Sequence, residues 1–372
     1  MSTLADRVVQ VLDHVVPARR GLVVLHSSPD LDDMALALLA AQPSGVTTVI
    51  LADLPRKARQ RLLDLDLPHV RIVGKQSPRG IWAYLRSHRS VSTHGLFGSR
   101  RRGRGKLSAT PWHGELSKPI GVFVGRPPRH FDRIAVSNQN SKILRVAEFQ
   151  VSPDSIHVIG TPRQSTLLKG PRSERVMRLK GTQKWVLFVP TYRQPTRGPM
   201  VDVFESTQED LNAEMAGLDQ MMGDQDAVLW VRPHPLTDPS SLAMPNARLA
   251  TDDILQQSGV TFYDVLAATD VLITDYSSVW VDFLLLDKPV VGFCPDIEKY
   301  RASRGLALEP YESWFPGAVV TGRDHLFGEV TDAVAGRDTH AQRRAFLTSI
   351  LMEARPNAAH DFWSILDVER AG

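Results

Sequence analysis

Residues 263–300 read YDVLAATDVLITDYSSVWVDFLLLDKPVVGFCPDIEKY, and this stretch decides the fold. It predicts a helix, a short strand, a polar turn, an apolar helix and a second strand, because apolar runs alternate with helix-like spacing. The turn contains Thr274, Asp275, Ser277 and Ser278. A strand that ends in a Ser-rich turn at a helix start is suited to phosphate, since backbone N–H groups and hydroxyls converge there. An ordinary helix N-cap uses the same residue types, so the turn alone leaves both interpretations open.

The same alternation of short apolar runs and helical patterns extends over the whole chain. It predicts an α/β protein with parallel sheets covered by helices on both faces. A polar stretch at 161–181 is the predicted linker, which gives an N-terminal domain at 1–165, a C-terminal domain at 182–340 and helices at 341–372 that pack back on the domains. Strands are predicted at Leu22–Leu25, Thr47–Leu51, Ile120–Val124, Arg133–Val136, Ile156–Ile159, Trp185–Val189, Ala227–Val231, Val271–Ile273 and Val290–Phe293.

Composition is that of a globular protein. The 372 residues are 42% apolar and 23% charged, which favours two folded domains over disorder. A net charge of +3 gives no argument for a nucleic-acid partner. The single cysteine, Cys294, lies in an apolar strand pattern, so we expect a buried thiol and a reducing compartment. No signal peptide is visible, and the run Met34–Ala41 is too short to span a bilayer, so we expect a cytoplasmic location.

Three further turns carry candidate chemistry. Trp112-His113-Gly114 offers an imidazole that can accept a proton near neutral pH, although a lone loop histidine is more often a surface residue. Arg232-Pro233-His234-Pro235 follows a strand, and its prolines hold His234 rigidly; a stiff solvent-exposed turn is an equal alternative. Pro190-Thr191-Tyr192-Arg193 also follows a strand, and Arg193 is suited to clamp a phosphate, with Thr191 adding a hydroxyl.

A basic stretch precedes His113. It contains Arg86, His88 and Arg89 and then the run Arg100, Arg101, Arg102, Arg104 and Lys106. A mobile loop of this kind predicts contact with a polyanionic acceptor or an anionic membrane face, and a solvated loop without a partner is the alternative. Stacking aromatics for nucleic acid are absent, since only Phe97 is close.

No motif requires a metal. The chain has no zinc-type Cys/His spacing and no Gly-rich phosphate loop of the GxxxxGK[ST] or GxGxxG type. The stretch HSSPDLDD at 26–33 suggests a metal site at first, but a strand end followed by a helix cap explains it better. Mg²⁺ is possible without being implied.

Together these motifs resemble the CDP-glycerol glycerophosphotransferase family, which builds teichoic-acid-type polyol-phosphate polymers. The resemblance covers residues from about 110 to 330, and its most distinctive block is 263–317. Glu115 and Ser165 stand where the family usually has Thr and commonly Asp. The further matching segments are WHG with Lys118 and Gly121, VSN at 136–138, GTPR at 160–163, VPTYR at 189–193, RPHP at 232–235 and Pro316-Gly317.

The resemblance implies a GT-B-like architecture, with two Rossmann-like domains facing a central cleft. It implies that polyol phosphate passes from CDP-glycerol or CDP-ribitol to a hydroxyl of a lipid-linked or polymeric acceptor, with CMP released at the inner membrane face. His113 would be the general base and His234 would contact the donor phosphate. The residues expected around the diphosphate are Thr191, Arg193, Arg232, Thr274, Asp275, Ser277, Ser278 and Asp282.

Two other functions remain open on sequence grounds. A GT-B glycosyltransferase would use the same scaffold with a nucleotide sugar and release a nucleoside diphosphate. A non-catalytic protein that binds anionic polymers would use the basic stretch and show no turnover. Two histidines at strand-end turns favour an enzyme over the binding protein.

Overall fold

The computed structural model describes residues 4–65, 67, 70–114, 116, 118–170, 174–191, 208–233, 246–353 and 355–368. The chain divides into two compact units, and we describe each by itself. The N-terminal unit comprises Met1–Glu115, Ile120–Lys169 and Glu353–Gly372. The C-terminal unit comprises Leu116–Pro119 and Gly170–Met352.

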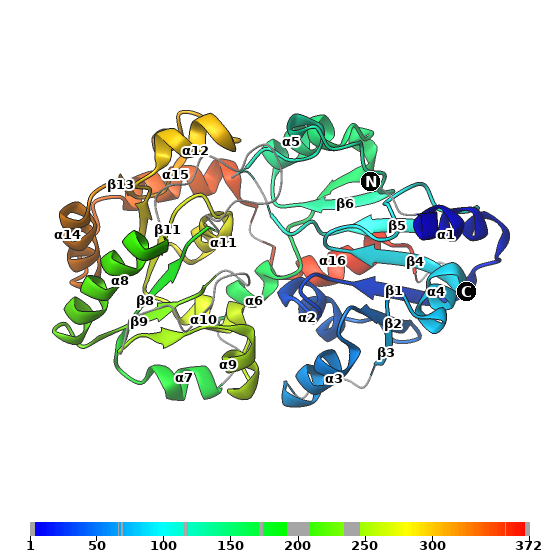
Figure 1. Cartoon of the computed structure of the whole chain (residues 1–372), viewed down its shortest axis with the longest axis horizontal. Helices are drawn as coiled ribbons and strands as arrows, with labels where there is room; N and C mark the ends of the chain where they lie inside the picture. Colours follow the sequence, from blue (N-terminus) through cyan, green and yellow to red (C-terminus); the bar gives the residue numbers. More distant parts are fainter. Residues whose placement is uncertain are drawn as a thin grey trace. The chain divides into compact units, whose positions relative to one another are not determined.

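A seven-stranded parallel sheet forms the centre of the N-terminal unit, in the order β3-β2-β1-β4-β5-β6-β7 (Figure 1). The first six strands have the order 3-2-1-4-5-6 of a Rossmann fold, in which ligands bind where the order reverses, here between β1 and β4. The strands are β1 Arg19–His26, β2 Thr47–Ala52, β3 Arg71–Gly74, β4 Ser87–Ser92, β5 Leu107–Thr110, β6 Arg133–Val136 and β7 Ile156–Val158. The helices of this unit are α1 Leu4–Val15, α2 Asp33–Ala40, α3 Pro55–Asp64, α4 Pro78–Arg86, η1 Gly121–Val124, α5 Gln139–Phe149, η2 Pro153–Ser155, α6 Gln164–Leu168 and α16 Ala358–Ile365.

Both faces of this sheet are buried, which is why its strands read as continuous apolar runs. On β1, Leu22 and Val24 belong to one core cluster, and Val23 and Leu25 belong to the cluster on the opposite face. Helix α16 comes from the end of the chain and completes the second cluster. Its Trp363 indole donates to the carbonyl of Leu38 at 2.9 Å, so the helix labelled α16 in Figure 1 is part of the N-terminal unit.

The C-terminal unit is built around a six-stranded parallel sheet in the order β10-β9-β8-β11-β12-β13. Its order also reverses once, between β8 and β11. The strands are β8 Lys184–Val189, β9 Ala227–Val231, β10 Arg248–Leu249, β11 Val271–Thr274, β12 Val290–Phe293 and β13 Ala318–Val320. The helices are α7 Glu174–Lys180, α8 Gln208–Gly223, α9 Asp252–Gln257, α10 Phe262–Ala268, α11 Val279–Phe283, η4 Leu284–Leu286, α12 Ile297–Ser303, α13 Tyr311–Trp314, α14 Arg323–Val334 and α15 Ala341–Leu351.

The prediction of an α/β fold with two Rossmann-like sheets is confirmed. The predicted cleft concerns the placement of the two domains relative to each other and stays a prediction. Cys294 is fully buried, as expected, and forms no disulfide. The predicted linker at 161–181 contains α6 and α7, and the division between the units falls after Lys169. Among the described helices, none combines the length and the apolar character that crossing a bilayer requires.

One predicted strand, Ile120–Val124, is wrong. The segment forms the 3₁₀-helix η1, in which Gly121 has φ +59 and packs against the backbone of α5. Left-handed backbone at Gly121 interrupts an extended run, and Phe123 and Val124 are exposed rather than buried in a sheet.

Candidate active site

His113 lies just beyond the carboxyl end of β5, in the N-terminal unit. Its Nδ1 is 2.9 Å from the carbonyl oxygen of Thr93. A carbonyl only accepts, so this nitrogen carries the hydrogen and the neutral ring keeps a basic lone pair on Nε2. The structure therefore fixes the tautomer that a general base needs.

A second histidine, His94, stacks on His113. The two ring centroids are 3.5 Å apart and the planes differ by 10°. His94 Nδ1 lies 2.9 Å from the hydroxyl of Thr93, so the two oxygens of one residue hold both imidazoles. His94 and Thr93 were not predicted as site residues, because β4 was not recognised as a strand and its His88 and Arg89 were assigned to a basic stretch.

The backbone of the Trp-His-Gly turn is held by two arginines. Arg163 donates to the carbonyl of His113 at 3.0 Å, and Arg145 donates to the carbonyl of Gly114 at 3.0 Å. Arg145 is fully buried and paired with Glu148 at 2.6 Å, so its position is fixed. Glu115, the next residue of the turn, lies outside the described residues.

Burial favours the uncharged form of both imidazoles. It lowers the pKa of His113 well below the usual range, and His94 and the two arginines lower it further. It also lowers the pKa of His94 to about 4, with His26, Arg129 and Arg163 adding to the effect. In the same unit Asp32 caps α2 by accepting the N–H of Ala35, and burial raises the pKa of Asp32 to about 7.

The Ser-rich turn that contains Asp275, Ser277 and Ser278 lies at the carboxyl end of β11. The Asp275 carboxylate accepts the Thr191 N–H with both oxygens, at 2.9 and 3.0 Å, and so joins the ends of β8 and β11. Thr274 donates its hydroxyl to the carbonyl of Val189 at 2.7 Å. The two strands flank the reversal point of this sheet, where ligands bind in such folds.

Ser277 and Ser278 are half-buried and open the short helix α11. This helix is only five residues long, so its dipole contributes little and the hydroxyls and N–H groups are the main donors. Asp282 is buried and accepts from the Tyr263 hydroxyl at 2.5 Å, which anchors the helix.

Arg232 is half-buried at the end of β9. Its guanidinium donates to Asp252 at 2.7 Å and to the carbonyl of Ala250 at 2.5 Å, so contact with a donor would require it to leave these partners. Arg193 and His234, the two remaining residues predicted around the donor, lie outside the described residues.

The prediction of a mobile basic loop is wrong for several of its residues. Arg89 is buried in β4 and donates to the carbonyl of Leu366. Arg102 and Lys106 form buried ion pairs with Asp13 at 2.8 and 2.9 Å, with side chains only 1% exposed. Both neutralise an internal carboxylate, whose pKa they lower, and neither faces an acceptor. Arg100, Arg101 and Arg104 are exposed.

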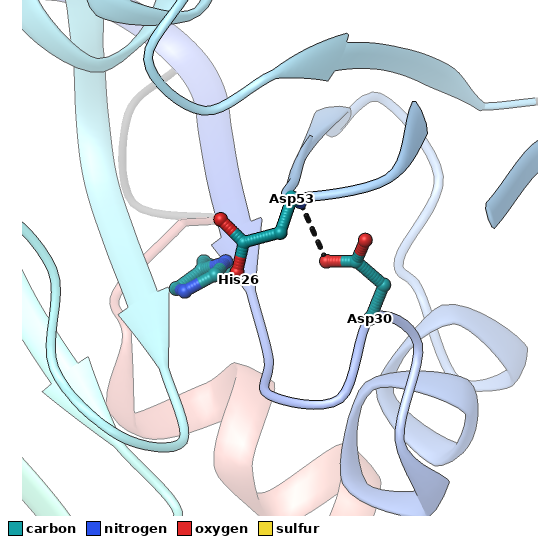
Figure 2. A group of neighbouring side chains, drawn as sticks. All are labelled: His26, Asp30 and Asp53. Carbon is teal, nitrogen blue, oxygen red and sulfur yellow. Dashed lines mark hydrogen bonds between the residues drawn. The ribbon is translucent and has the colours of Figure 1, made fainter. Parts of the chain in front are cut away.

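His26, Asp30 and Asp53 place ligand atoms within 4.8 Å of one another (Figure 2). Lys75, however, lies 2.7 Å from Asp53 and 3.4 Å from His26 Nε2, and Asp30 accepts the N–H groups of Asp53 and Leu54. An ammonium and two backbone donors already satisfy these side chains, so the residues fit a structural cluster better than a cation site. As predicted, Asp32 caps α2 and Asp33 lies in its first turn.

Two teichoic acid primases are similar to this chain in sequence. The chain is 25% identical over 205 residues to a teichoic acid glycerol-phosphate primase of Bacillus subtilis, covering 54% of this chain and 49% of that protein. It is 29% identical over 219 residues to a teichoic acid ribitol-phosphate primase of Bacillus spizizenii, covering 55% and 52%. The chain spans about half the length of the curated relatives it matches.

Solved structures share the fold. A histidine variant of the wall teichoic acid polymerase TagF superposes with a TM-score of 0.77 at 18% identity, covering 98% of this chain and 93% of that chain. A putative UDP-N-acetylglucosamine 2-epimerase from Listeria monocytogenes gives a TM-score of 0.57 at 13% identity, covering 94% and 96%. At these identities the likeness concerns the fold alone.

The resemblance seen in the sequence is thus confirmed over nearly the whole chain. The sequence profile of one family matches residues 9–354. The chain belongs to the CDP-glycerol:poly(glycerophosphate) glycerophosphotransferase family.

Proposed function

We propose that the protein transfers a polyol phosphate from a CDP-activated donor to a hydroxyl of an acceptor and releases CMP. Membership of the family supports this reaction, and one structural observation carries it. The imidazole of His113 is neutral, bonded to Thr93 through Nδ1, and keeps Nε2 as a base at the carboxyl edge of the sheet.

In this reaction the acceptor is bound by the N-terminal unit. His113 Nε2 takes the proton of the acceptor hydroxyl as its oxygen attacks the phosphorus that bears the polyol. The new P–O bond replaces the bond to the CMP phosphate, and CMP leaves with the electron pair. Phosphoryl transfer of this kind depends on positioning and on donors aimed at the phosphoryl oxygens more than on a strong base.

The donor is bound by the C-terminal unit. The joined ends of β8 and β11 support this role, because Asp275 and Thr274 tie the two strand ends while Ser277 and Ser278 keep accessible hydroxyls. We assign the donor phosphate contacts to Ser277, Ser278, Thr191 and Arg193, and the stabilisation of the leaving phosphate to His234. Thr274, Asp275 and Asp282 shape the turn, and the role of Arg232 depends on its release from Asp252.

The finer assignment follows the relatives. We propose CDP-glycerol or CDP-ribitol as donor and a lipid-linked or polymeric acceptor, with the protein acting at the inner face of the membrane. Within the predicted basic stretch, the exposed residues are Arg100, Arg101 and Arg104.

The test is a donor screen that identifies the nucleotide released. CDP-glycerol and CDP-ribitol are expected to give CMP in the presence of an acceptor, and His113→Ala and His234→Ala are each expected to lower turnover by at least about 100-fold. Release of UDP from a nucleotide sugar would indicate a glycosyltransferase instead. Salt-sensitive polymer binding without turnover on any activated donor would indicate a binding protein.

A further inference from the structure

A groove of about 650 Å³ lies in the N-terminal unit, away from the carboxyl edge that carries His113. Its walls come from the segments just before β5, β6 and β7, so it opens at the amino ends of these strands. The floor includes Phe131, which is buried. Apart from Arg100 and Arg101 of the predicted basic stretch, no residue with a proposed role lines this groove.

The groove is lined by four arginines, Arg100, Arg101, Arg129 and Arg133. Two aspartates also reach it, Asp132 and Asp154. The Asp132 carboxylate is occupied, since it accepts the N–H and the hydroxyl of Ser108 and pairs with His130 at 3.2 Å. Positive charge therefore dominates the lining.

Arg100 and Arg101 are the cations that remain available. Both are exposed, and neither has a hydrogen bond or an ion pair with any described residue. The other two are partly engaged. Arg133 donates to the carbonyl of Asp132 at 2.9 Å, and Arg129 donates to the carbonyl of His94 at 2.5 Å.

The backbone that carries Arg100 and Arg101 is held on both sides. On one side the His130 N–H donates to the carbonyl of Ser99 at 2.9 Å. On the other, Arg102 and Lys106 are locked onto Asp13. The two arginines therefore project from an anchored segment, which lowers the entropic cost of binding a ligand.

We propose that this groove binds a phosphodiester group of the acceptor chain, at a distance from its reacting end. This inference rests on the proposed function, because a polyol-phosphate acceptor carries one negative charge at each repeat. Guanidinium groups suit phosphate, since they donate two parallel hydrogen bonds to its oxygens. Arg129 connects the groove to the candidate active site. Its guanidinium donates to the His94 carbonyl, and its Cζ lies 5.0 Å from the centroid of the Trp112 ring.

The experiment compares two variants of the same segment. Arg100→Gln/Arg101→Gln removes the uncommitted groove cations, and Arg104→Gln removes an exposed cation that does not line the groove. Binding of a fluorescent glycerol-phosphate oligomer is titrated at low and at high salt. The double variant is expected to bind about tenfold more weakly with a smaller salt dependence, and Arg104→Gln is expected to bind like the parent protein.

Kinetics give the second readout. In CMP-release assays the double variant is expected to raise KM for the acceptor about tenfold and to leave KM for the donor unchanged.

Equal losses of affinity in both variants would show a diffuse charge effect, and unchanged binding in the double variant would show that the acceptor does not use the groove; either result overturns the inference. Binding to phosphatidylglycerol vesicles is measured alongside. If the double variant lost affinity for these vesicles but not for the oligomer, the inference would also be overturned. A parent protein without CMP release defeats the proposed function, while the oligomer titration still decides the groove.

Discussion

At the scale of single residues, Thr93 organises the proposed base. Its carbonyl fixes the tautomer of His113 and its hydroxyl holds His94 against the same ring. His113 was predicted from its sequence motif, but its partners were not. Motif reading finds residues that are adjacent in sequence, whereas Thr93 and His94 reach His113 only because β4 and β5 are neighbouring strands.

His94→Phe tests this arrangement through a pH profile. A phenyl ring can keep the stack but cannot carry the charge that opposes protonation of His113, so the pKa of His113 is expected to rise. Arg163 and Arg145 also lower this pKa and stay in place. The acid limb of kcat/KM for the acceptor should therefore move to higher pH.

The matched control is His157→Phe, which replaces a histidine of β7 that has no ring contact with His113 among the described residues. Its acid limb should coincide with that of the parent protein. An unshifted limb in His94→Phe, with folding intact by circular dichroism, would contradict the role given to the stack.

Arg163→Ala tests the support of the turn. Loss of its bond to the His113 carbonyl is expected to lower kcat by about 10- to 100-fold, because a small displacement of the base weakens proton transfer. KM for the donor should not change, since Arg163 belongs to the N-terminal unit, for which we propose acceptor binding. A donor KM that rises in parallel with the loss of kcat would contradict this division of roles.

At the scale of elements, most of the longer apolar strands were predicted, whereas the short strands β3, β10 and β13 and the polar strands β4 and β5 were not. β4 reads SHRSVS and β5 reads LSAT, yet β4 lies in the middle of the sheet. Such sequences are buried because their polar groups find internal partners, as Arg89 does on the Leu366 carbonyl. Those partners lie far away in sequence, so local pattern cannot reveal them.

The segment from Arg100 to Lys106 shows the same limit. Its members look alike in sequence, but Arg102 is buried on Asp13 and Arg104 is exposed. Arg102→Ala is expected to lower the free energy of unfolding by about 3–5 kcal/mol, because it leaves Asp13 buried with one partner fewer. Arg104→Ala should change it by less than about 0.5 kcal/mol. Urea titration of both variants checks the contrast, and equal values would contradict the buried pair.

Two glycines at η1 allow the cost of a left-handed backbone to be measured separately from the cost of steric overlap. Gly121 has φ +59 and a Cβ there would overlap the carbonyl oxygen of Glu148, whereas Gly125 has φ +67 and open space. Gly125→Ala should cost about 1 kcal/mol of unfolding free energy, the penalty of left-handed backbone. Gly121→Ala should cost at least about 2 kcal/mol more, because α5 must shift. Equal costs in urea titrations would show that the α5 contact is not tight.

At the scale of the whole molecule, the two units differ in their buried histidines. Burial lowers the pKa of His26, His88, His94, His113 and His157, and all five belong to the N-terminal unit. In the C-terminal unit the described histidines are less enclosed, since His325 is exposed and His340 is half-buried. The two units are therefore expected to respond differently to acid.

The direction in which stability changes with pH follows from which state binds more protons. A histidine whose pKa is lower in the folded state binds protons more readily when unfolded, so its contribution to stability is present above pH 6.5 and is lost as pH falls. For His94 the loss runs from about pH 6.5 to about 4 and amounts to at most about 3 kcal/mol. Asp32 acts in the opposite direction, because its pKa is raised to about 7 and its contribution is lost as pH rises from about 4 to 7. Five histidines lose their stabilising contribution as pH falls, and only Asp32 gains one. The N-terminal unit is therefore expected to be less stable in acid.

Hydrogen exchange measured in urea at pH 7 and at pH 5 resolves this, because peptides report on each unit separately. The midpoint for peptides of β1, β4 and β5 should fall between these two pH values, and the midpoint for peptides of β8, β11 and β12 should stay nearly constant. In His94→Phe the shift of the N-terminal unit should become smaller, since one lowered pKa is removed. If both units lost stability equally in the parent protein, the acid response would come from net charge rather than from the histidines that hold the proposed base.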